Sequence, residues 1–275
     1  MAFVPAESTR PLAGHPDGSS LPWPKWGDYL KQMTCAISFF AIGLMVSPVC
    51  ALLSRCFGTR IPSSTGQTII RGLFKGWLWF SCRIGVFEIE FPEAEKLQHL
   101  RGTVLAPNHP SLIDAVIILS VVPHTVCIMR ANLIESPFLG GAARLAGFVP
   151  NDKGPALVRR GMEKLEGGEN LLIFPEGTRT STLAINPFKN GFALIAKKTG
   201  ASIQTVLIER RGRYLSKGVS LFSPGRIPFR FRLRLGQLIR ADSGESAQQL
   251  AARLEEYFRG RLENTGEDLR ILDPS

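Results

Sequence analysis

The sequence predicts an α/β fold: a mixed, mainly parallel sheet covered by helices and preceded by an N-terminal helical membrane anchor. Two patterns lead to this prediction. After residue 86, short apolar or alternating segments of strand length are followed repeatedly by segments with helical spacing, which is typical of βαβ units. Before that point, residues 33–53 contain no charged side chain, and a run of this length can cross the apolar core of a bilayer as a helix.

Three segments are expected along the chain. Residues 1–32 are rich in Pro, Gly and Ser and are expected to form a flexible leader. Residues 33–86 are expected to form a membrane-anchoring helical segment, in which Arg and Lys interrupt the apolar side chains of a second helix at about 67–85. An interfacial amphipathic helix and an ordinary core-packing helix both fit this second helix. Residues 87–275 are expected to form an α/β domain that ends in a helix.

The flanks of the uncharged run favour a membrane helix over a buried helix of a soluble protein. Trp23, Lys25, Trp26 and Lys31 precede it, and such mixtures of aromatic and basic residues are frequent at membrane interfaces. A cleaved signal peptide is disfavoured because the leader is too long and the apolar run too extended.

The elements of the α/β domain follow from the period of the apolar residues. Strands are expected at 87–91, 103–106, 125–129, 171–174 and 202–208, with a brief extended piece at 148–150. Helices are expected at 112–121, 135–146, 157–165, 188–199 and 247–258. Glycines are expected to end two of them, Gly147 the second and Gly200 the fourth, and Asp242 or Ser243 is expected to cap the last.

Residues 229–235 alternate apolar side chains with Arg230, Arg232 and Arg234. This pattern predicts a strand with one apolar and one basic face. A solvated edge strand protected by charge and a surface that faces an anion are both consistent with it.

The composition restricts the partners. The formal net charge of +10 indicates an anionic partner: nucleic acid, anionic lipid or a phosphorylated substrate. The 44% of hydrophobic residues argues against a disordered nucleic-acid tail, and no segment reads as a nucleic-acid-binding module. The five cysteines show no Cys-x-x-Cys spacing, so neither a zinc site nor a disulfide framework is predicted, which suits a reducing compartment. No metal or cofactor is expected.

The first candidate for chemistry is Pro-Asn-His-Pro-Ser-Leu-Ile-Asp at 107–114, which directly follows the strand expected at 103–106. Open α/β sheets bind ligands at this end of their strands. Residues five apart on a regular helix point about 140° away from each other, so His109 and Asp114 cannot meet on one helix. Pro110 favours the first helical position and an extended residue before it. We therefore expect His109 just outside the helix, with Asp114 holding one imidazole nitrogen and the other nitrogen acting as a base.

The second candidate is Phe-Pro-Glu-Gly-Thr-Arg-Thr at 174–180, which follows a predicted strand. It offers a carboxylate, a glycine that permits close approach of the backbone to a ligand, a hydroxyl and a guanidinium. The guanidinium of Arg179 is the side chain best matched to a phosphate. A third loop at the end of a predicted strand, residues 147–153, adds the cation of Lys153.

These stretches together resemble the lysophospholipid acyltransferases of the 1-acylglycerol-3-phosphate acyltransferase type. The Asn-His-x-x-x-x-Asp block is present at 108–114, Phe-Pro-Glu-Gly-Thr-Arg is matched without change at 174–179, and Phe-Lys-x-Gly is present at 188–191. The similarity covers roughly residues 66–240. Two departures from the family concern binding of the acceptor. The middle block of the family, which residues 147–153 occupy here, ends in Lys153 where the family commonly has arginine, and residues 203–206 lack the usual proline.

The resemblance implies transfer of a fatty acyl group from a thioester, acyl-CoA or acyl carrier protein, to a hydroxyl of a lysophospholipid such as 1-acylglycerol-3-phosphate. His109, oriented by Asp114, is implied as the general base, and the acceptor hydroxyl itself attacks. The implied acceptor-binding or phosphate-binding residues are Glu176, Gly177, Thr178, Arg179 and Lys153, with Glu176 ordering its loop. Backbone N–H groups near Pro110 or Gly177 are expected to stabilise the oxyanion.

The implied partners are the thioester donor, a lysolipid acceptor and the membrane, and no nucleic acid. Residues 87–275 would then be the acyltransferase domain, facing the cytoplasm at the cell inner membrane because the thioester donor is cytoplasmic. Two alternatives stay open: an acyltransferase for an ornithine-lipid or polyene-lipid type of acceptor, and a non-catalytic membrane lipid-binding protein. A serine hydrolase is disfavoured because the sequence has no Gly-x-Ser-x-Gly motif.

Overall fold

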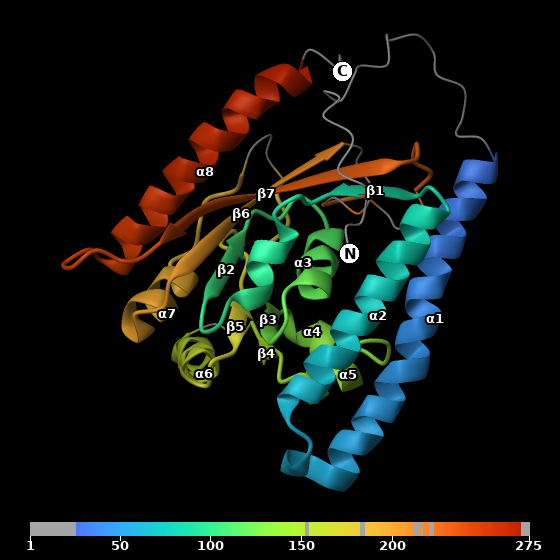
Figure 1. Ribbon diagram of the computed structural model, residues 1–275, viewed down its shortest axis with the longest axis horizontal. Coiled ribbons are helices and arrows are strands. Elements are labelled where there is room, and N and C mark those ends of the chain that lie inside the picture. Colours follow the sequence, from blue (N-terminus) through green and yellow to red (C-terminus); the bar gives the residue numbers. More distant parts are fainter. Residues whose placement is uncertain are drawn as a thin grey trace.

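A single seven-stranded sheet forms the centre of the protein (Figure 1). The computed structural model describes residues 26–151, 154–181, 185–211, 215, 217–219 and 223–270. The strands are β1 (Phe87–Glu90), β2 (Val104–Pro107), β3 (Thr125–Met129), β4 (Val149–Pro150), β5 (Asn170–Leu172), β6 (Ile203–Arg211) and β7 (Phe229–Ile239). The α-helices are α1 (Trp26–Phe57), α2 (Ser63–Arg83), α3 (Ile113–Val121), α4 (Ala131–Ile134), α5 (Gly140–Leu145), α6 (Pro155–Glu166), α7 (Gly191–Thr199) and α8 (Ala247–Arg270), and the 3-10 helices are η1 (Gly58–Arg60) and η2 (Ala94–His99).

The strand order is β1-β7-β6-β2-β5-β3-β4. Among the described strands only the β6–β7 pair is antiparallel. The prediction of a mixed, mainly parallel sheet covered by helices is therefore confirmed. The carboxyl ends of β3, β5, β2 and β6 consequently lie along one edge of the sheet.

The helices pack in two groups. Helices α1, α2, α3 and α5 contact one another, and α6, α7 and α8 contact one another in turn. Right-handed crossovers place α3 and α5 on one face of the sheet and α6 and α7 on the other, because the chain reverses its direction across the sheet after β4. In Figure 1, α1 and α2 run side by side as a long hairpin along one side of the domain.

Trp26 is the first described residue and already lies in helix α1, so residues 26–32, which we expected in the leader, are helical. Residues 1–25 lie outside the described part. Two hydrogen bonds hold this segment of α1 against the protein. The buried side chain of Gln32 donates a hydrogen bond to the carbonyl of Ser223 (2.7 Å) and accepts one from the backbone of Gly225 (3.1 Å).

Helix α2 packs on the domain with one face. Ile70, Trp77 and Leu78 are buried, and the helix contacts α3 and α5, which supports the core-packing interpretation for this face. Trp79 and the basic side chains of Lys75 and Arg83 are exposed on it. A single cluster of buried apolar residues extends from α1 and α2 into the sheet. The core is thus continuous across the expected boundary between residues 86 and 87.

The prediction of one continuous helix at 135–146 is wrong. The structure has the short α4 and α5 with a connection that contains Pro137, and proline disrupts a continuous helix. Of the two glycines at the start of α5, Gly141 allows close approach of α1, whereas Gly140 lies against the carbonyl of Ile134. A Cβ added at Gly141 would overlap the carbonyl oxygen of Ser47.

Strand β7 is not an edge strand, because β1 and β6 pair with its two sides. Its basic face is not a surface of unpaired cations either. Arg230 bonds Glu88 (2.9 Å), and Arg232 bonds Glu90 (2.8 Å). A third pair joins Arg234 to Glu209. Both interpretations of residues 229–235 are therefore corrected: the carboxylates of neighbouring strands neutralise this face.

The cap of α8 also differs from the prediction. Ser246, rather than Asp242 or Ser243, precedes the helix. Its Oγ accepts a hydrogen bond from the backbone of Gln249 (3.2 Å), and the Gln249 side chain accepts one from the backbone of Ser246 (2.8 Å). This reciprocal pair is a capping box.

Candidate active site

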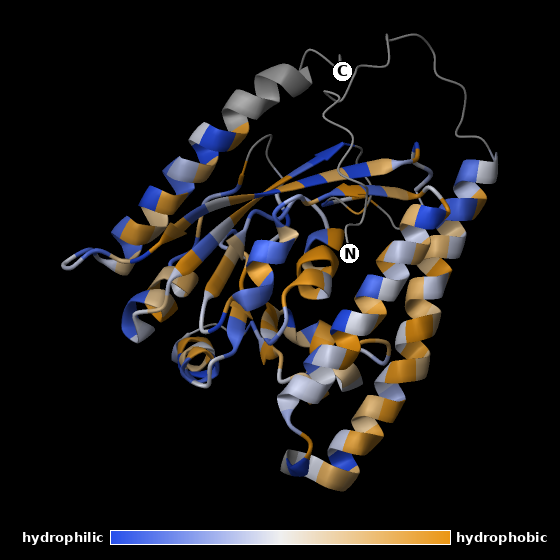
Figure 2. Ribbon diagram, viewed as in Figure 1, coloured by the Kyte–Doolittle hydropathy of each residue, from blue (hydrophilic) through white to orange (hydrophobic). Residues whose placement is uncertain are grey.

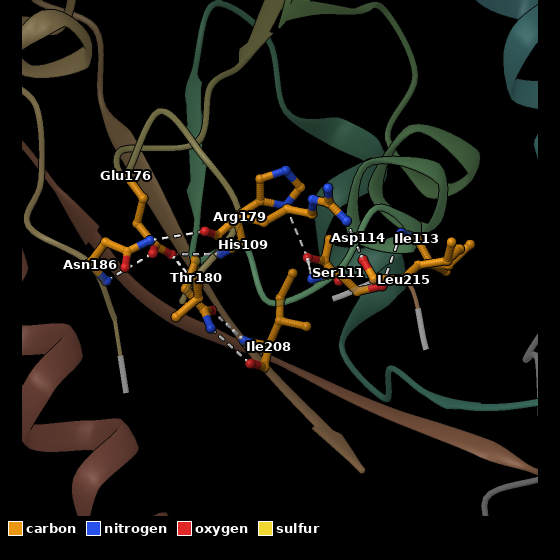
Figure 3. A network of polar contacts seen from close by, with 11 residues as sticks. His109, Ser111, Ile113, Asp114, Glu176, Arg179, Thr180, Asn186, Ile208 and Leu215 are labelled. Carbon is orange, nitrogen blue, oxygen red and sulfur yellow. Dashed lines mark hydrogen bonds and ion pairs between the residues drawn. The ribbon is translucent and has the colours of Figure 1, made fainter. Parts of the chain in front are cut away.

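The candidate site lies where parallel strands end. His109 follows β2, the loop of Arg179 follows β5, and Arg130 follows β3. Because β2 pairs with both β5 and β6, these loops start at the same edge of the sheet. The two stretches singled out in the sequence, although about sixty residues apart, are thus brought together (Figure 3).

His109 and Asp114 form the expected pair. The Nδ1 atom of His109 lies 3.1 Å from Oδ2 of Asp114. The histidine lies outside the helix and the aspartate in the first turn of α3. The helix begins at Ile113, one residue after the expected 112. The inference that Pro110 takes the first helical position is wrong, because the backbone N–H of Ser111 donates to Asp114 Oδ2 (2.7 Å) and forms a turn before the helix.

The environment of Asp114 opposes its ionisation. The side chain is fully buried, and this burial raises the pKa of its carboxyl group. The hydrogen bond and charge of His109, the backbone of Ser111 and the charge of Arg210 act in the opposite direction. Oδ1 of Asp114 is buried without a hydrogen-bond partner. A protonated His109 would therefore stabilise the buried carboxylate by its positive charge.

The imidazole of His109 stacks on an aromatic ring and remains partly exposed. Its ring stacks on Phe174, with centroids 3.8 Å apart and planes inclined by 21°. The side chain is 14% exposed, compared with 0% for Asp114. With Nδ1 directed at the carboxylate, Nε2 is the nitrogen available to a ligand.

Glu176 is buried and joins the two loops instead of facing a ligand. Its Oε1 accepts hydrogen bonds from the backbone of His109 (2.9 Å) and the hydroxyl of Thr180 (2.7 Å). Its Oε2 accepts one from the backbone of Asn186 (2.8 Å). A further bond runs from the backbone of Thr180 to the carbonyl of His109 (2.7 Å). The side chain expected to order its loop thus also orders the backbone of the histidine.

Asn108 holds the end of β2 against β6. Its amide nitrogen donates to the carbonyl of Ile208 (2.8 Å), and its amide oxygen accepts from the backbone of Ile208 (2.7 Å). The side chain thereby takes the place of a backbone partner in the ladder of the sheet. This buried pair fixes the point at which His109 leaves the strand.

Gly177 adopts a backbone conformation that favours glycine, with φ of 65°. An added Cβ would meet the Lys189 side chain at 2.8 Å. Its N–H donates to the carbonyl of Phe174 (2.9 Å), which closes the turn. Thr178, next in the loop, is half-buried.

Arg179 extends from the same loop toward the start of α3 (Figure 3). Its Nη1 donates to the carbonyl of Leu215 (2.9 Å). Burial lowers the pKa of the guanidinium, the neighbouring charge of Arg130 lowers it further, and the charge of Asp114 raises it. Two guanidinium groups that repel each other favour an anion between them.

Several of the backbone N–H groups near the expected oxyanion site are engaged with protein atoms. Besides the bonds already made by Ser111 and Gly177, the N–H of Leu112 donates to the carbonyl of Leu215 (3.4 Å). Lys153, the remaining expected phosphate ligand, lies outside the described residues.

A model of the Acyltransferase family matches residues 88–209, the stretch that contains both loops. Residues 88–209 therefore form a domain of the Acyltransferase family. The fold agrees with that of a known member: the structure of the 1-acyl-sn-glycerophosphate acyltransferase PlsC from Thermotoga maritima superimposes with a TM-score of 0.66, at 21% identity, over 87% of this chain and 95% of that one.

Two relatives show the range of the similarity. A chloroplastic 1-acyl-sn-glycerol-3-phosphate acyltransferase of Brassica napus is 27% identical over 150 residues, which are 51% of this chain and 43% of that protein. A lyso-ornithine lipid O-acyltransferase of Pseudomonas aeruginosa is 28% identical over 156 residues, 55% of this chain and 59% of that protein. The matched parts thus span about half the length of these family members.

Several residues of the site were not singled out for a role by the sequence. Phe174 and Asn108 lie inside the recognised blocks, but their partners are visible only in the fold. Thr180 and Asn186 are the hydrogen-bond partners of Glu176, and their spacing in the sequence does not reveal this. Arg130 had a usable signal, because it directly follows a predicted strand, and ligand-binding residues gather at such ends.

Proposed function

We propose that the protein is a membrane-associated O-acyltransferase that moves a fatty acyl group from a thioester, acyl-CoA or acyl carrier protein, to the free hydroxyl of a lysophospholipid. The preferred acceptor is 1-acylglycerol-3-phosphate. The observation that carries the proposal is the His109–Asp114 pair at 3.1 Å beside the two cations of Arg179 and Arg130. A base and an anion site at one sheet edge suit a hydroxyl on a phosphorylated molecule.

The reaction needs one proton acceptor and no nucleophile from the protein. Nε2 of His109 removes the proton from the acceptor hydroxyl as its oxygen attacks the thioester carbonyl carbon. The tetrahedral intermediate then breaks its carbon–sulfur bond, and the imidazolium returns the proton to the leaving thiolate. The buried carboxylate of Asp114 stabilises the imidazolium formed between these steps and keeps Nδ1 protonated. The products are a diacyl lipid and a free thiol.

Arg179 and Arg130 are the proposed anchor of the acceptor phosphate. A phosphate monoester carries close to two negative charges at neutral pH, so it offsets the repulsion between the two guanidinium groups. Thr178 precedes Arg179 in the loop and can add a hydroxyl donor. Lys153 is retained as a candidate ligand from its place in the middle block.

The long helix α1 is the proposed membrane contact. It is the one described helix with the length and apolar composition of a membrane span, and 17% of its most apolar stretch is buried. A stripe of side chains on it is more than half exposed: Leu30, Ile37, Leu44, Met45, Val49 and Leu52. Figure 2 shows the apolar character of α1 beside the mixed surface of α2. We infer that this stripe enters a membrane, for which a bacterial inner membrane with the site facing the cytoplasm is the expected setting.

The domain is attached to α1 over much of its length. Phe40 packs on Phe138, with ring centroids 5.1 Å apart, and Gly141 donates a backbone hydrogen bond to the hydroxyl of Ser47 (2.8 Å). The inner side of α1 is thus covered by protein. The exposed stripe on its outer side would bring the site to the surface where lipid substrates reside.

A second acceptor class is favoured by one observation, the similarity to the lyso-ornithine lipid O-acyltransferase of Pseudomonas aeruginosa. The same pair of guanidinium groups would bind a carboxylate by charge-assisted hydrogen bonds. The chemistry at His109 would be unchanged, because only the headgroup differs.

The deciding experiment supplies labelled acyl-CoA and acyl carrier protein thioesters, with 1-acylglycerol-3-phosphate, lyso-ornithine lipid and neutral 1-acylglycerol, to the purified protein. We expect acylation of 1-acylglycerol-3-phosphate, and a kcat at least about a hundredfold lower for His109→Ala. His99→Ala is the control, since this histidine is exposed at the end of η2. Full activity of His109→Ala would reject the base, and transfer to none of the acceptors would reject the function.

A further inference from the structure

The carbonyl of Leu215 connects the two halves of the candidate site. Leu215 belongs to the connection between β6 and β7 and is distant in sequence from both recognised loops. Its oxygen accepts a hydrogen bond from Nη1 of Arg179 (2.9 Å) and a longer one from the backbone of Leu112 (3.4 Å). Leu112 precedes α3, the helix of Asp114. One oxygen atom therefore contacts both the guanidinium of Arg179 (Figure 3) and the residue that precedes the helix of Asp114.

The backbone of Leu215 adopts an uncommon conformation to direct this oxygen. Its φ is 56°, and His124 is the only other non-glycine residue of the described chain with positive φ. Such a conformation costs free energy for an L-residue and persists only where the surroundings hold it. The surroundings are visible here: the Leu215 side chain is 8% exposed and belongs to the main apolar core. The buried side chain thus fixes the residue while its carbonyl faces the site.

We propose that Leu215 is a positioning residue that sets the distance between the anion anchor and the base. This inference rests on the proposed function. The Leu215 carbonyl holds Nη1 of Arg179, so a displaced carbonyl would shift this guanidinium, and an anionic headgroup bound to it would no longer hold its hydroxyl at His109. The bond from Leu112 fixes the same carbonyl relative to the start of α3. The position of the Arg179 guanidinium is therefore fixed relative to the His109–Asp114 pair.

The test exchanges the shape of the side chain and leaves its composition unchanged. Leucine and isoleucine are isomers, but a branched Cβ is strongly disfavoured at positive φ. Leu215→Ile should therefore displace the carbonyl and raise the KM for the anionic acceptor roughly tenfold, the usual effect of losing one hydrogen bond to a charged group. The matched control is Leu207→Ile in β6, where the residue is also 8% exposed and a branched Cβ is favoured. We expect an unchanged KM for it.

A double-mutant cycle separates positioning from a general structural role. In an Arg179→Ala background, Leu215→Ile should change the KM less than about twofold, because its effect passes through the missing guanidinium. Effects that multiply, or a KM unchanged by Leu215→Ile alone, would overturn the role of Leu215. Wild-type protein that acylates no anionic lysolipid would overturn the proposed function instead, so the two failures are distinguishable.

A second variant covers the case in which Leu215→Ile does not fold. Leu112→Pro removes the N–H that donates to Leu215, and the φ of −66° at Leu112 already suits proline. The Leu112 side chain is 44% exposed, so little packing is changed. We expect a KM about threefold higher for the anionic acceptor, as for one neutral hydrogen bond, and again no added effect in Arg179→Ala. An unchanged KM, or a full effect in the Arg179→Ala background, would contradict the proposal.

Discussion

Oε1 of Glu176 lies 2.9 Å from the backbone nitrogen of His109. A side chain of one loop thereby holds the main chain that carries the candidate base of the other. This contact explains why a carboxylate is present in the Phe-Pro-Glu-Gly-Thr-Arg block although it points into the protein. Glu176 therefore orders the backbone of both loops, and Arg179, three residues further on, is the side chain of this loop that we propose for ligand binding.

Glu176→Gln should damage both stability and rate. The new NH2 group must replace one carboxylate oxygen, and both oxygens accept hydrogen bonds from donors within the protein. A donor facing a donor in a buried site should lower the free energy of unfolding by about 2 kcal/mol. Denaturant unfolding and kcat measure the two effects. Glu163→Gln, the same change at a side chain that is 63% exposed, should stay within about 0.5 kcal/mol of the wild type. Equal behaviour of the two variants would contradict the buried role.

Asp114→Asn should stabilise the protein at neutral pH while it lowers kcat. Burial raises the pKa of Asp114 in the folded state, so the folded protein binds this proton more tightly than the unfolded chain does. The ionised carboxylate therefore lowers the free energy of unfolding at pH values above the pKa of the folded state. This loss decreases as the pH falls and is absent below the pKa of an unfolded aspartate, about 3.9. The unfolding midpoint of the variant should exceed that of the wild type at pH 8, with the difference shrinking as the pH falls.

The control for this pH dependence is Asp242→Asn, because the Asp242 side chain is 77% exposed. We expect parallel stability curves for this variant and the wild type. A difference at Asp114 that grows toward low pH would show that the sign of the linkage is wrong.

Arg179→Lys should weaken binding of a phosphorylated acceptor. Lysine keeps the charge but loses the planar fork, which donates to Leu215 and has further N–H groups that could bind an anion at the same time. We expect the KM for 1-acylglycerol-3-phosphate to rise at least about tenfold, with a smaller rise for neutral 1-acylglycerol. Steady-state kinetics with both acceptors measure the contrast. Arg159→Lys, at a side chain that is 74% exposed on α6, is the control. Equal rises for the two acceptors would remove Arg179 from headgroup binding.

The exposed stripe of α1 should govern membrane binding. Ile37→Glu combined with Val49→Glu places two charges among apolar side chains that are 63% and 57% exposed, and we expect the fraction that cosediments with anionic phospholipid vesicles to fall severalfold. Gln248→Glu on the exposed side of α8 is the control. Undiminished cosedimentation of the double variant, with folding verified by circular dichroism, would place the membrane contact elsewhere.

Some elements were predictable because their signals are local. The pattern of apolar residues indicates β1, β3 and α6 at nearly their observed positions, since β1 and α6 each bury one face and β3 is buried on both. The break between α4 and α5 also had a local signal in Pro137, which the helical spacing of the neighbouring residues outweighed. The apolar period predicted the start of α3 to within one residue. The preference of Pro110 for the first helical position placed this start a turn too early, because the bond from Ser111 to Asp114 forms a turn before the helix.

The amino-acid sequence by itself determined the alternation of strands and helices, the approach of Asp114 to His109 and the presence of a cation in the second loop. Each depends on residues close together in the chain. Only the tertiary structure decided that β7 lies inside the sheet, that Asn108 pairs with Ile208 and that Leu215 reaches Arg179. The physical reason is that these contacts depend on which strands become neighbours, and strand order is settled by packing of the whole core rather than by any local pattern.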